Sequence, residues 1–222
     1  MSQDKTADSA AVGFIRYPGS HKGRDSSVIS PVTSAAPEAA GIVTEIVTDA
    51  FALDPVWSWV FPERVKQQHY WRMFIRGALR YPHVYKTGGY EAVSVWIPPE
   101  KSAFLPEDSQ NFEAIIQALS GAEAPRVLTF LDKFDQFHPR DKPHYYLGLL
   151  AVQNAFRGGG IGMALLKENL QRFDHEGMPS YLESSNAANN AKYEALGYVQ
   201  VVTFQTVEDG PVVTGMWRDP AG

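Results

Sequence analysis

Cysteine is absent from this chain of 222 residues. Its absence excludes disulfide bonds, thiolate metal ligands and a cysteine nucleophile. A chain without cysteine also fits a reducing compartment, and we expect a cytoplasmic protein. No apolar run approaches the ~20 residues of a membrane span, and the N-terminus lacks the apolar core of a signal peptide. We therefore expect no membrane partner.

An excess of basic residues is also lacking. Asp and Glu number 25 against 20 Lys and Arg, which gives a formal net charge of -5 at pH 7. Nucleic-acid binding usually needs a basic face, so we expect no nucleic-acid partner. This charge suits a cationic ligand better than an acidic one. With 44% hydrophobic and 12% aromatic residues, the composition is that of a globular domain with a sizeable core.

Several motifs of well-known sites are missing. No Gly-Lys-Ser/Thr occurs, which excludes a P-loop, and no G-x-S-x-G occurs, so Ser184-Ser185 is not a hydrolase nucleophile. The six histidines show neither i,i+4 pairing nor cysteine partners. We therefore expect no metal site and assign the histidines to surface or structural positions.

The most informative segment present runs from Leu149 to Leu166. An apolar strand leads into a basic residue, a cluster of glycines and an amphipathic helix. Glycines allow successive N–H groups to approach a ligand, and a helix start adds unpaired donors and the positive end of its dipole. The segment therefore predicts a phosphate site formed by Arg157, Gly158, Gly159, Gly160, Ile161, Gly162 and Met163.

The spacing of the glycines narrows the choice of ligand. The dinucleotide fingerprint G-x-G-x-x-G fails in both registers, because Met163 or Leu165 stands at its last position. Glu183 ends the next strand, where a ribose-binding acid could lie. Only about forty residues follow it, too few to repeat the strand–helix unit of a dinucleotide fold. The pattern that remains is Arg157-x-x-Gly160-x-Gly162.

This pattern resembles the pyrophosphate loop of the GNAT superfamily of acyl-CoA-dependent N-acetyltransferases. Tyr181 to Asn186, followed by Asn189, Tyr193 and Leu196-Gly197-Tyr198, is similar to the second half of that superfamily's domain. The chain is most similar to the puromycin N-acetyltransferase group. The shared features are Phe51 to Pro55, Trp96 before a proline, His138-Pro139, Gly177-Met178-Pro179, Gly210-Pro211 and Arg218-Asp219-Pro220.

The resemblance implies an α/β (α+β) fold with a mixed, mostly antiparallel central sheet flanked by helices on both faces. We expect a polar tail over residues 1–27 and a single N-acetyltransferase domain over 28–222. The patterns predict strands at 28–32, 84–86, 92–96, 145–152, 181–183, 199–205 and 212–217. They predict helices at 34–50 with Ser34 as N-cap, at 64–81, at 107–137 in two pieces, from 161 to before Gly177, and at 189–196. The apolar strand 145–152 is expected to be buried on both faces.

The resemblance also implies acetyl-CoA as co-substrate. Backbone groups of Leu150, Ala151 and Val152 would pair with the pantetheine arm, and Asn189 would hydrogen-bond to the arm or cap a helix. Tyr193 is the expected general acid, because a phenol of pKa ~10 stays protonated and can donate to a thiolate. The alternative for Tyr193 is an aromatic that only packs a helix on the sheet.

Glu183 is the expected base, which would take the amine proton directly or through water. Alternatively it only orients a cationic acceptor. The acceptor site is expected to contain Asp54, Trp57, Trp59 and Trp96, because aromatic rings with one acid suit an aromatic or cationic amine.

These features together predict an N-acetyltransferase that transfers acetyl from acetyl-CoA to the amine of a small molecule. Because the chain has no cysteine, the amine would attack directly within a ternary complex. Two alternatives remain: a protein or peptide amine as acceptor, and a non-catalytic sensor that binds acyl-CoA. The sequence leaves open a homodimer.

Overall fold

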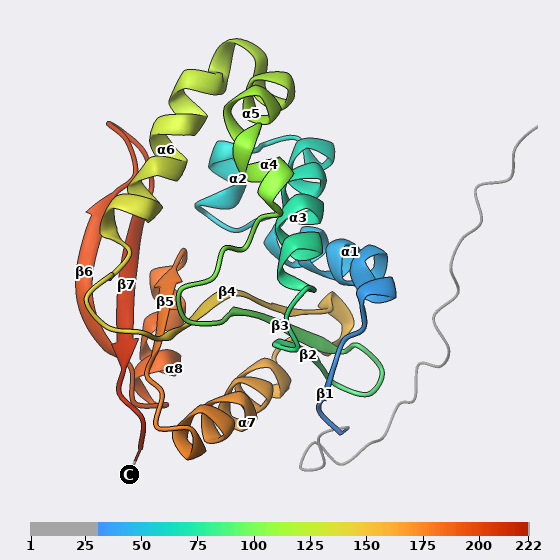
Figure 1. Ribbon diagram of the computed structural model, residues 1–222, viewed down its shortest axis with the longest axis vertical. Helices are drawn as coiled ribbons and strands as arrows, with labels where there is room; N and C mark the ends of the chain where they lie inside the picture. Colours follow the sequence, from blue (N-terminus) through green and yellow to red (C-terminus); the bar gives the residue numbers. More distant parts are fainter. Residues whose placement is uncertain (1–30, 222) are drawn as a thin grey trace, which may run out of the picture.

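The structure is a computed structural model that describes residues 31–221 (Figure 1). One sheet contains seven strands in the order β1-β2-β3-β4-β5-β7-β6. All neighbours pair antiparallel except β4 and β5, which are parallel. The strands are β1 (Thr33–Ser34), β2 (Val84–Lys86), β3 (Ala92–Ile97), β4 (Tyr145–Val152), β5 (Ser180–Ser184), β6 (Val199–Gln205) and β7 (Val212–Arg218). The predicted mixed, mostly antiparallel sheet is confirmed.

Helices cover both faces of this sheet (Figure 1). On one face α1 and α3 bury an apolar cluster that includes Val43, Phe74 and Leu149. On the other face α7 buries Leu166 and Phe173. The helices are α1 (Ala40–Phe51), α2 (Trp57–Val60), α3 (Arg64–Ala78), α4 (Pro106–Gln110), α5 (Phe112–Ser120), α6 (Ala124–Phe137), α7 (Ile161–His175) and α8 (Asn190–Glu194). The predicted covering of both faces is therefore confirmed.

The start of the described chain differs from the prediction. Ser34 belongs to β1, and its hydroxyl donates to the carbonyl of Pro82 at 2.9 Å, so it does not cap a helix. The first helix begins only at Ala40, after a 3-10 turn at Pro37–Ala39. Proline fits the first turn of a helical segment because it needs no N–H partner there, and this moves the start past Ser34. The predicted tail, 1–27, and most of the predicted strand 28–32 lie outside the described residues.

The middle of the chain forms a helical pair beside the sheet. The predicted break is confirmed: Gly121 has φ of 57° and begins the turn Gly121–Glu123, and Pro125 lies in the first turn of α6. At its other end α6 is held to β6, because the ring of Phe137 stacks on Phe204 with 4.6 Å between centroids. The pair α5–α6 therefore lies beside the central strands (Figure 1).

Strand β4 has the predicted bounds but not the predicted burial. Its side chains alternate between buried and half-buried, so the expectation of burial on both faces is wrong. Tyr146 and Gly148 line a large cavity, and Leu150 lines a narrow groove. The half-buried positions of this apolar strand are therefore available to a ligand.

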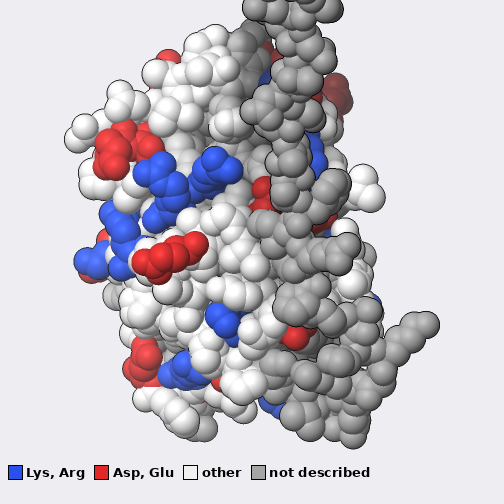
Figure 2. All heavy atoms as spheres, turned by 90° about the vertical axis from the view of Figure 1, so that its right-hand side faces the viewer, with Lys and Arg blue, Asp and Glu red and all other residues white. Residues whose placement is uncertain are grey.

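Charges of both signs lie side by side on the face shown in Figure 2. Between α1 and α3, Arg64 pairs with Glu45 at 3.0 Å and with Asp49 at 2.6 Å. All three side chains are about half exposed, so these pairs contribute little to stability. In the described range no helix combines the length and the apolar character needed to cross a membrane.

Candidate active site

The central strands β4 and β5 separate part-way along their length. They pair only at Tyr145 with Ser180, Tyr146 with Tyr181 and Leu147 with Leu182. Beyond these pairs β4 continues to Val152 and no described strand pairs with its β5-facing edge. A β-sheet edge of this kind offers main-chain donors and acceptors to an extended ligand.

A β-bulge at Gly148 accompanies this separation. Opposite it on β3, Val95 pairs with Leu149 and Trp96 pairs with Leu147, so Gly148 is the extra residue. A Cβ at this position would lie 2.5 Å from Cζ of Phe74, which leaves no space for a side chain. The bulge also reverses the alternation of the strand, because Leu147 packs toward α7 while Leu149 packs toward α1 and α3.

A narrow groove of about 50 Å³ lies where the two strands separate. Its walls bring together residues from β4, β5 and α8 with aromatic side chains of the N-terminal half. The residues used below are Phe51, Trp57, Leu150, Glu183, Asn189 and Tyr193. Trp57 and Tyr193, which are 136 positions apart in the sequence, thus line one groove.

The glycine-rich loop presents a row of N–H donors beside the end of β4. Gly158 and Gly160 have φ of 83° and 76°, a region that favours glycine. In the described part of the chain, no backbone carbonyl accepts a hydrogen bond from the N–H groups of residues 158 to 163. At Gly162 a Cβ would lie 2.7 Å from Cγ2 of Val152, so the loop and the strand approach closely. This arrangement fits an anion such as a pyrophosphate.

Arg157 is held beside this loop by backbone carbonyls. Its Nη2 donates to the carbonyl of Ala50 at 2.6 Å, and its Nε donates to the carbonyl of Val152 at 3.5 Å. The side chain thereby joins the end of α1 to the end of β4. Its charge lies next to the row of N–H groups, and its Nε and Nη2 are already used in hydrogen bonds to backbone carbonyls.

Tyr193 lies in the groove and stays protonated. Burial, together with the charge of Asp54, raises the pKa of Tyr193 to about 12. Its ring also packs edge-on against Tyr198, with 6.1 Å between centroids. The ring contact fits the packing alternative raised by the sequence, and the role of general acid stays a prediction.

Asn189 lines the groove close to Tyr193. Its Oδ1 accepts a hydrogen bond from Nζ of Lys192 at 2.9 Å. The helix-capping role considered for it belongs to Asn186, whose Oδ1 accepts from the N–H of Ala188 at 3.0 Å. The neighbouring Asn190 is partly buried and its Nδ2 donates to Oγ1 of Thr214 at 3.3 Å.

Glu183 is the most deeply buried acid of the site, with only 2% of its side chain exposed. Its Oε2 accepts a hydrogen bond from the hydroxyl of Tyr146 at 2.6 Å. Its Oε1 lies 3.7 Å from Nδ1 of His138 and has no hydrogen-bond partner among the described residues. Burial and the neighbouring carboxylate raise the pKa of Tyr146 well above its usual value, so the phenol remains a donor.

A cavity of about 1250 Å³ opens on the other side of Glu183. It lies between β4, α3 and α6 and is also lined by the segments around residues 98–104 and 138–144. Trp57, Phe134, Tyr146, Gly148 and Glu183 border both this cavity and the narrow groove. The two spaces therefore meet at Glu183. No group of side chains that could hold a metal ion occurs among residues 31–221.

Comparison with known proteins finds a family match over the second half of the site. Residues 138–219 match the family model of the acetyltransferase (GNAT) domain. An uncharacterized N-acetyltransferase of Schizosaccharomyces pombe is 32% identical over 81 residues, which are 36% of this chain and 33% of the relative. The match thus spans about a third of that relative.

Solved structures extend the fold to most of the chain. A structure of a histone acetyltransferase HPA2 and related acetyltransferase from Corynebacterium glutamicum has a TM-score of 0.61 and 22% identity, covering 88% of this chain and 98% of that one. Arylalkylamine N-acetyltransferase 2 from Aedes aegypti has a TM-score of 0.60 and 13% identity, covering 86% and 99%. The GNAT fold predicted from the sequence is confirmed.

Three residues predicted for the acceptor site lie outside the lining of both spaces. Asp54 lines neither space: its Oδ1 accepts from the N–H groups of Val56 and Trp57, and its Oδ2 accepts from Ser185 at 2.6 Å. Trp59 also lines neither space and packs beneath Arg126, whose guanidinium lies 3.8 Å from the ring centroid. The predicted acceptor contacts of Asp54 and Trp59 therefore stay predictions.

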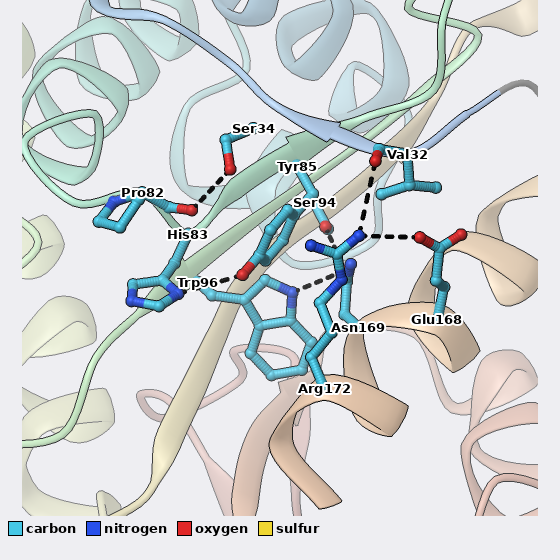
Figure 3. A network of polar contacts seen from close by, with 10 residues as sticks. All are labelled: Val32, Ser34, Pro82, His83, Tyr85, Ser94, Trp96, Glu168, Asn169 and Arg172. Carbon is cyan, nitrogen blue, oxygen red and sulfur yellow. Dashed lines mark hydrogen bonds and ion pairs between the residues drawn. The ribbon is translucent and has the colours of Figure 1, made fainter. Parts of the chain in front are cut away.

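Trp96 is buried in the core on the opposite face of the sheet. Figure 3 shows its indole pointing toward Asn169 of α7, to which Nε1 donates at 3.0 Å. Asn169 also accepts from Ser94 at 2.7 Å, and Phe173 packs edge-on against the indole. Because Trp96 has no exposed surface, the prediction that it contacts the acceptor is wrong.

The structure adds residues that the sequence did not assign to the site. His138 and His144 line the large cavity, and Tyr146 holds Glu183. His138 follows α6 and was noted only within the His138-Pro139 pair. The signal for Tyr146 is a phenol in a mostly apolar strand. Its pairing partner on β5, Tyr181, lies two residues before Glu183.

Proposed function

We propose that the chain is an acetyl-CoA-dependent N-acetyltransferase that acetylates a small-molecule amine by direct attack in a ternary complex. The observation that carries this proposal is the junction of the two spaces at Glu183. One space contains Tyr193 and Leu150 of β4, the strand that runs on toward the glycine-rich loop. The other is large enough to hold an acceptor and contains the buried carboxylate.

The loop and the free edge of β4 fit the two ends of acetyl-CoA. The N–H groups of residues 158 to 163 would bind the pyrophosphate, with Arg157 adding a positive charge. Main-chain groups of Leu150, Ala151 and Val152 would pair with the pantetheine arm, because β5 has already separated from β4 at that point. Acetyl-CoA supplies the acetyl group as a thioester, and the amine replaces its sulfur at the carbonyl carbon.

The large cavity indicates a bulky amine with an apolar or aromatic body. Its volume of about 1250 Å³ exceeds that of common small-ligand pockets, which span ~300–1,000 Å³. Aromatic rings that include Trp57, Phe74 and Phe134 line it. Its lining contains six acids and three bases, which favours a cationic acceptor. Walls formed by α3, α6 and two loops suit a compact molecule better than an extended peptide.

Glu183 is placed to act on the amine. Tyr146 already occupies Oε2, so Oε1 is the oxygen left for the acceptor's proton. Removing that proton leaves the nitrogen lone pair available for attack, which is the task of a general base. Burial of the carboxylate with a single hydrogen bond from protein keeps it reactive rather than fully paired.

Tyr193 would donate a hydrogen bond to the departing sulfur. Its pKa of about 12 lies above the ~8.5 typical of a thiol, so complete proton transfer is uphill by a factor of ~10³. The phenol therefore stabilises the developing thiolate as a donor, and the thiolate takes its proton from the solvent afterwards. This refines the role of full acid that an unperturbed phenol would allow.

Calorimetric titration of the full chain with acetyl-CoA tests the first half of the proposal. We expect micromolar binding, and Gly160→Asp should weaken it about 100-fold because it adds a negative charge and strains a left-handed residue. Gly121→Asp is the matched control, since Gly121 also has a positive φ and open space around it but lies away from the groove. Equal binding by both variants, or no binding by the wild type, would contradict the proposal.

Release of free thiol with a panel of amines tests the second half. We expect arylalkylamines such as 2-phenylethylamine and tryptamine to be acetylated faster than a peptide with a free N-terminus. Faster acetylation of the peptide would favour a protein acceptor, and acetyl-CoA binding without any transfer would favour a sensor. The puromycin subgroup, the homodimer, the cytoplasmic location and the absence of nucleic-acid and membrane partners stay predictions.

A further inference from the structure

Three segments bring a carboxylate and two imidazoles together at the junction of the two spaces. Glu183 comes from β5, His138 directly follows α6, and His144 directly precedes β4. Nδ1 of His138 lies 3.7 Å from Oε1 of Glu183, and the Nε2 atoms of His138 and His144 are 3.1 Å apart. Nδ1 of His144 lies 2.8 Å from the carbonyl of Lys142. The four groups form a continuous row.

The end of this row fixes where the protons lie. The carbonyl of Lys142 can only accept, so Nδ1 of His144 carries a hydrogen and donates to it. Burial lowers the pKa of His144, which keeps the ring neutral at physiological pH. Nε2 of His144 therefore has a lone pair, and the hydrogen in its contact with His138 belongs to Nε2 of His138.

The other end of the row lacks one proton. If His138 is neutral with its hydrogen on Nε2, its Nδ1 presents a lone pair to Oε1 of Glu183. Oε1 accepts no hydrogen bond within the geometric limits from the described residues, so two acceptors face each other across 3.7 Å. The Tyr181 hydroxyl, which also has no such partner, interacts with the same carboxylate. A proton placed between Nδ1 and Oε1 would satisfy both, and an unsatisfied buried acceptor is costly. The site is thus arranged to receive one proton.

We propose that His138 is the residue that takes up the acceptor's proton from Glu183, with His144 as the positioning residue that holds its ring. This inference rests on the proposed function. The cationic acceptor first loses one proton to Oε1 of Glu183, which frees the nitrogen lone pair. As the bond from nitrogen to the acetyl carbon then forms and the bond from carbon to sulfur breaks, the nitrogen loses its second proton to the solvent and the departing thiolate takes one proton from the solvent. The proton on Oε1 moves to Nδ1 of His138, and Glu183 becomes a carboxylate again.

The surroundings of His138 suit both holding and releasing this proton. The imidazolium would lie between the Glu183 carboxylate and the Nε2 lone pair of His144, two acceptors that stabilise its charge. A quarter of the His138 side chain, 25%, is exposed, so the proton can pass to water in the cavity. The titratable or charged groups that face His138 from the packed elements are Glu183 and Tyr181 of β5, Tyr146 of β4, His144, Asp135 of α6, and Arg140, Asp141 and Lys142 of the connecting loop.

Two variants separate proton uptake from hydrogen bonding. His138→Gln retains a donor near the Nε2 position, and His138→Asn retains a polar group near Nδ1, but neither side chain can take up a proton. We expect each to lower kcat for 2-phenylethylamine about 30-fold to 100-fold, with unchanged acetyl-CoA binding and a loss of the rise of kcat with pH. His175→Gln is the control, because His175 lies in the last turn of α7 away from both spaces and should leave kcat unchanged.

The result separates this inference from the proposed function. If the wild type transfers acetyl and both His138 variants keep its kcat and pH profile, the proton uptake by His138 is wrong and the acetyltransferase stands. If the wild type transfers no acetyl to any amine, the proposed function itself fails. Nitrogen NMR of the histidine rings gives a readout without activity: we expect hydrogen on Nε2 of His138 and on Nδ1 of His144. A hydrogen on Nε2 of the neutral His144 ring would contradict this assignment of protons and with it the proposed role of His138.

Discussion

Replacement of Gly148 by alanine tests whether the bulge in β4 exists because a side chain cannot fit there. The φ of Gly148 is not in the left-handed region, so the backbone tolerates alanine and only the contact with Phe74 opposes it. The new Cβ would lie 2.5 Å from Cζ and 2.9 Å from Cε1 of that ring. Overpacking of this kind costs about 1–3 kcal/mol, which lowers Tm of a chain of this size by roughly 2–10 °C.

A second substitution isolates the cause. Phe74→Leu removes both ring atoms that the new Cβ would meet, so Gly148→Ala should cost close to nothing in that background. The double-mutant cycle should give a coupling of about 1–2 kcal/mol. Gly41→Ala is the control for the chemical change: Gly41 lies in α1 with no atom within 4 Å of its Cβ position, and helix propensity predicts stabilisation of about 0.5–1 kcal/mol.

Urea unfolding of the four proteins in the cycle and of the control measures these values. The same proteins titrated with acetyl-CoA show whether the strained variant also disturbs the groove, since Gly148 borders both spaces. A Gly148→Ala variant as stable as the wild type, or a cost that persists in the Phe74→Leu background, would refute the steric account of the bulge.

Three other predictions follow from contacts described above. Tyr193→Phe should lower kcat about 10-fold to 100-fold without changing acetyl-CoA affinity. Because the pKa of Tyr193 is about 12, deprotonation of this phenol should not reduce the wild-type kcat between pH 7 and 10. Trp96→Phe should cost about 1–2 kcal/mol in chemical unfolding, because Asn169 loses a donor, yet leave KM for the amine unchanged. Asp174→Asn should cost about 3 kcal/mol, because it leaves the mostly buried Arg218 without its carboxylate. Arg218 lowers the pKa of Asp174. The ion pair therefore stabilises the fold fully above the unfolded pKa of ~3.9, and this stabilisation is lost as pH falls through the lower pKa of the folded state. The stabilities of wild type and variant should converge at that low pH in acid unfolding.

The fold was largely predictable because its local signals agree with its long-range packing. The β-branched and aromatic residues in 199–205 and 212–217, the glycine that follows α7 and the break near Gly121 each favour one local structure. The prediction that Ser34 caps the first helix was wrong. A potential capping residue does not fix where a helix starts when a proline three residues later begins the first turn. Its hydroxyl instead found a carbonyl 48 residues away, which no local pattern encodes.

The candidate site was predictable where backbone chemistry dominates. Glycines at 158, 160 and 162 report on backbone conformation and close approach, which are properties of the sequence itself. The aromatic residues gave no such signal, because the same ring serves in a core and in a pocket. Trp57 lies in α2 over one face of the sheet and lines the pocket, whereas Trp96 lies in β3 and faces α7 on the other side.

The row from Glu183 to His144 was not predictable for a related reason. His138 and His144 lie six residues apart in a segment that forms neither helix nor strand, so no periodicity predicts that they meet. Their contact depends on how the segment between α6 and β4 turns back along the sheet. Only the assembled tertiary structure brings their ring nitrogens within 3.1 Å.

The strand order has a consequence for how this protein is made. Of the described strands β7 is synthesised last, yet it lies between β5 and β6 and pairs with both. While the ribosome is still adding residues before Val212, β6 has no neighbour to pair with and β5 has one bare edge. The exposed valines at 199 and 201 would then belong to an unpaired segment, a state in which chains associate wrongly. A nascent chain that is stalled before Val212 should depend on a holding chaperone until β7 has been synthesised and can pair with β5 and β6.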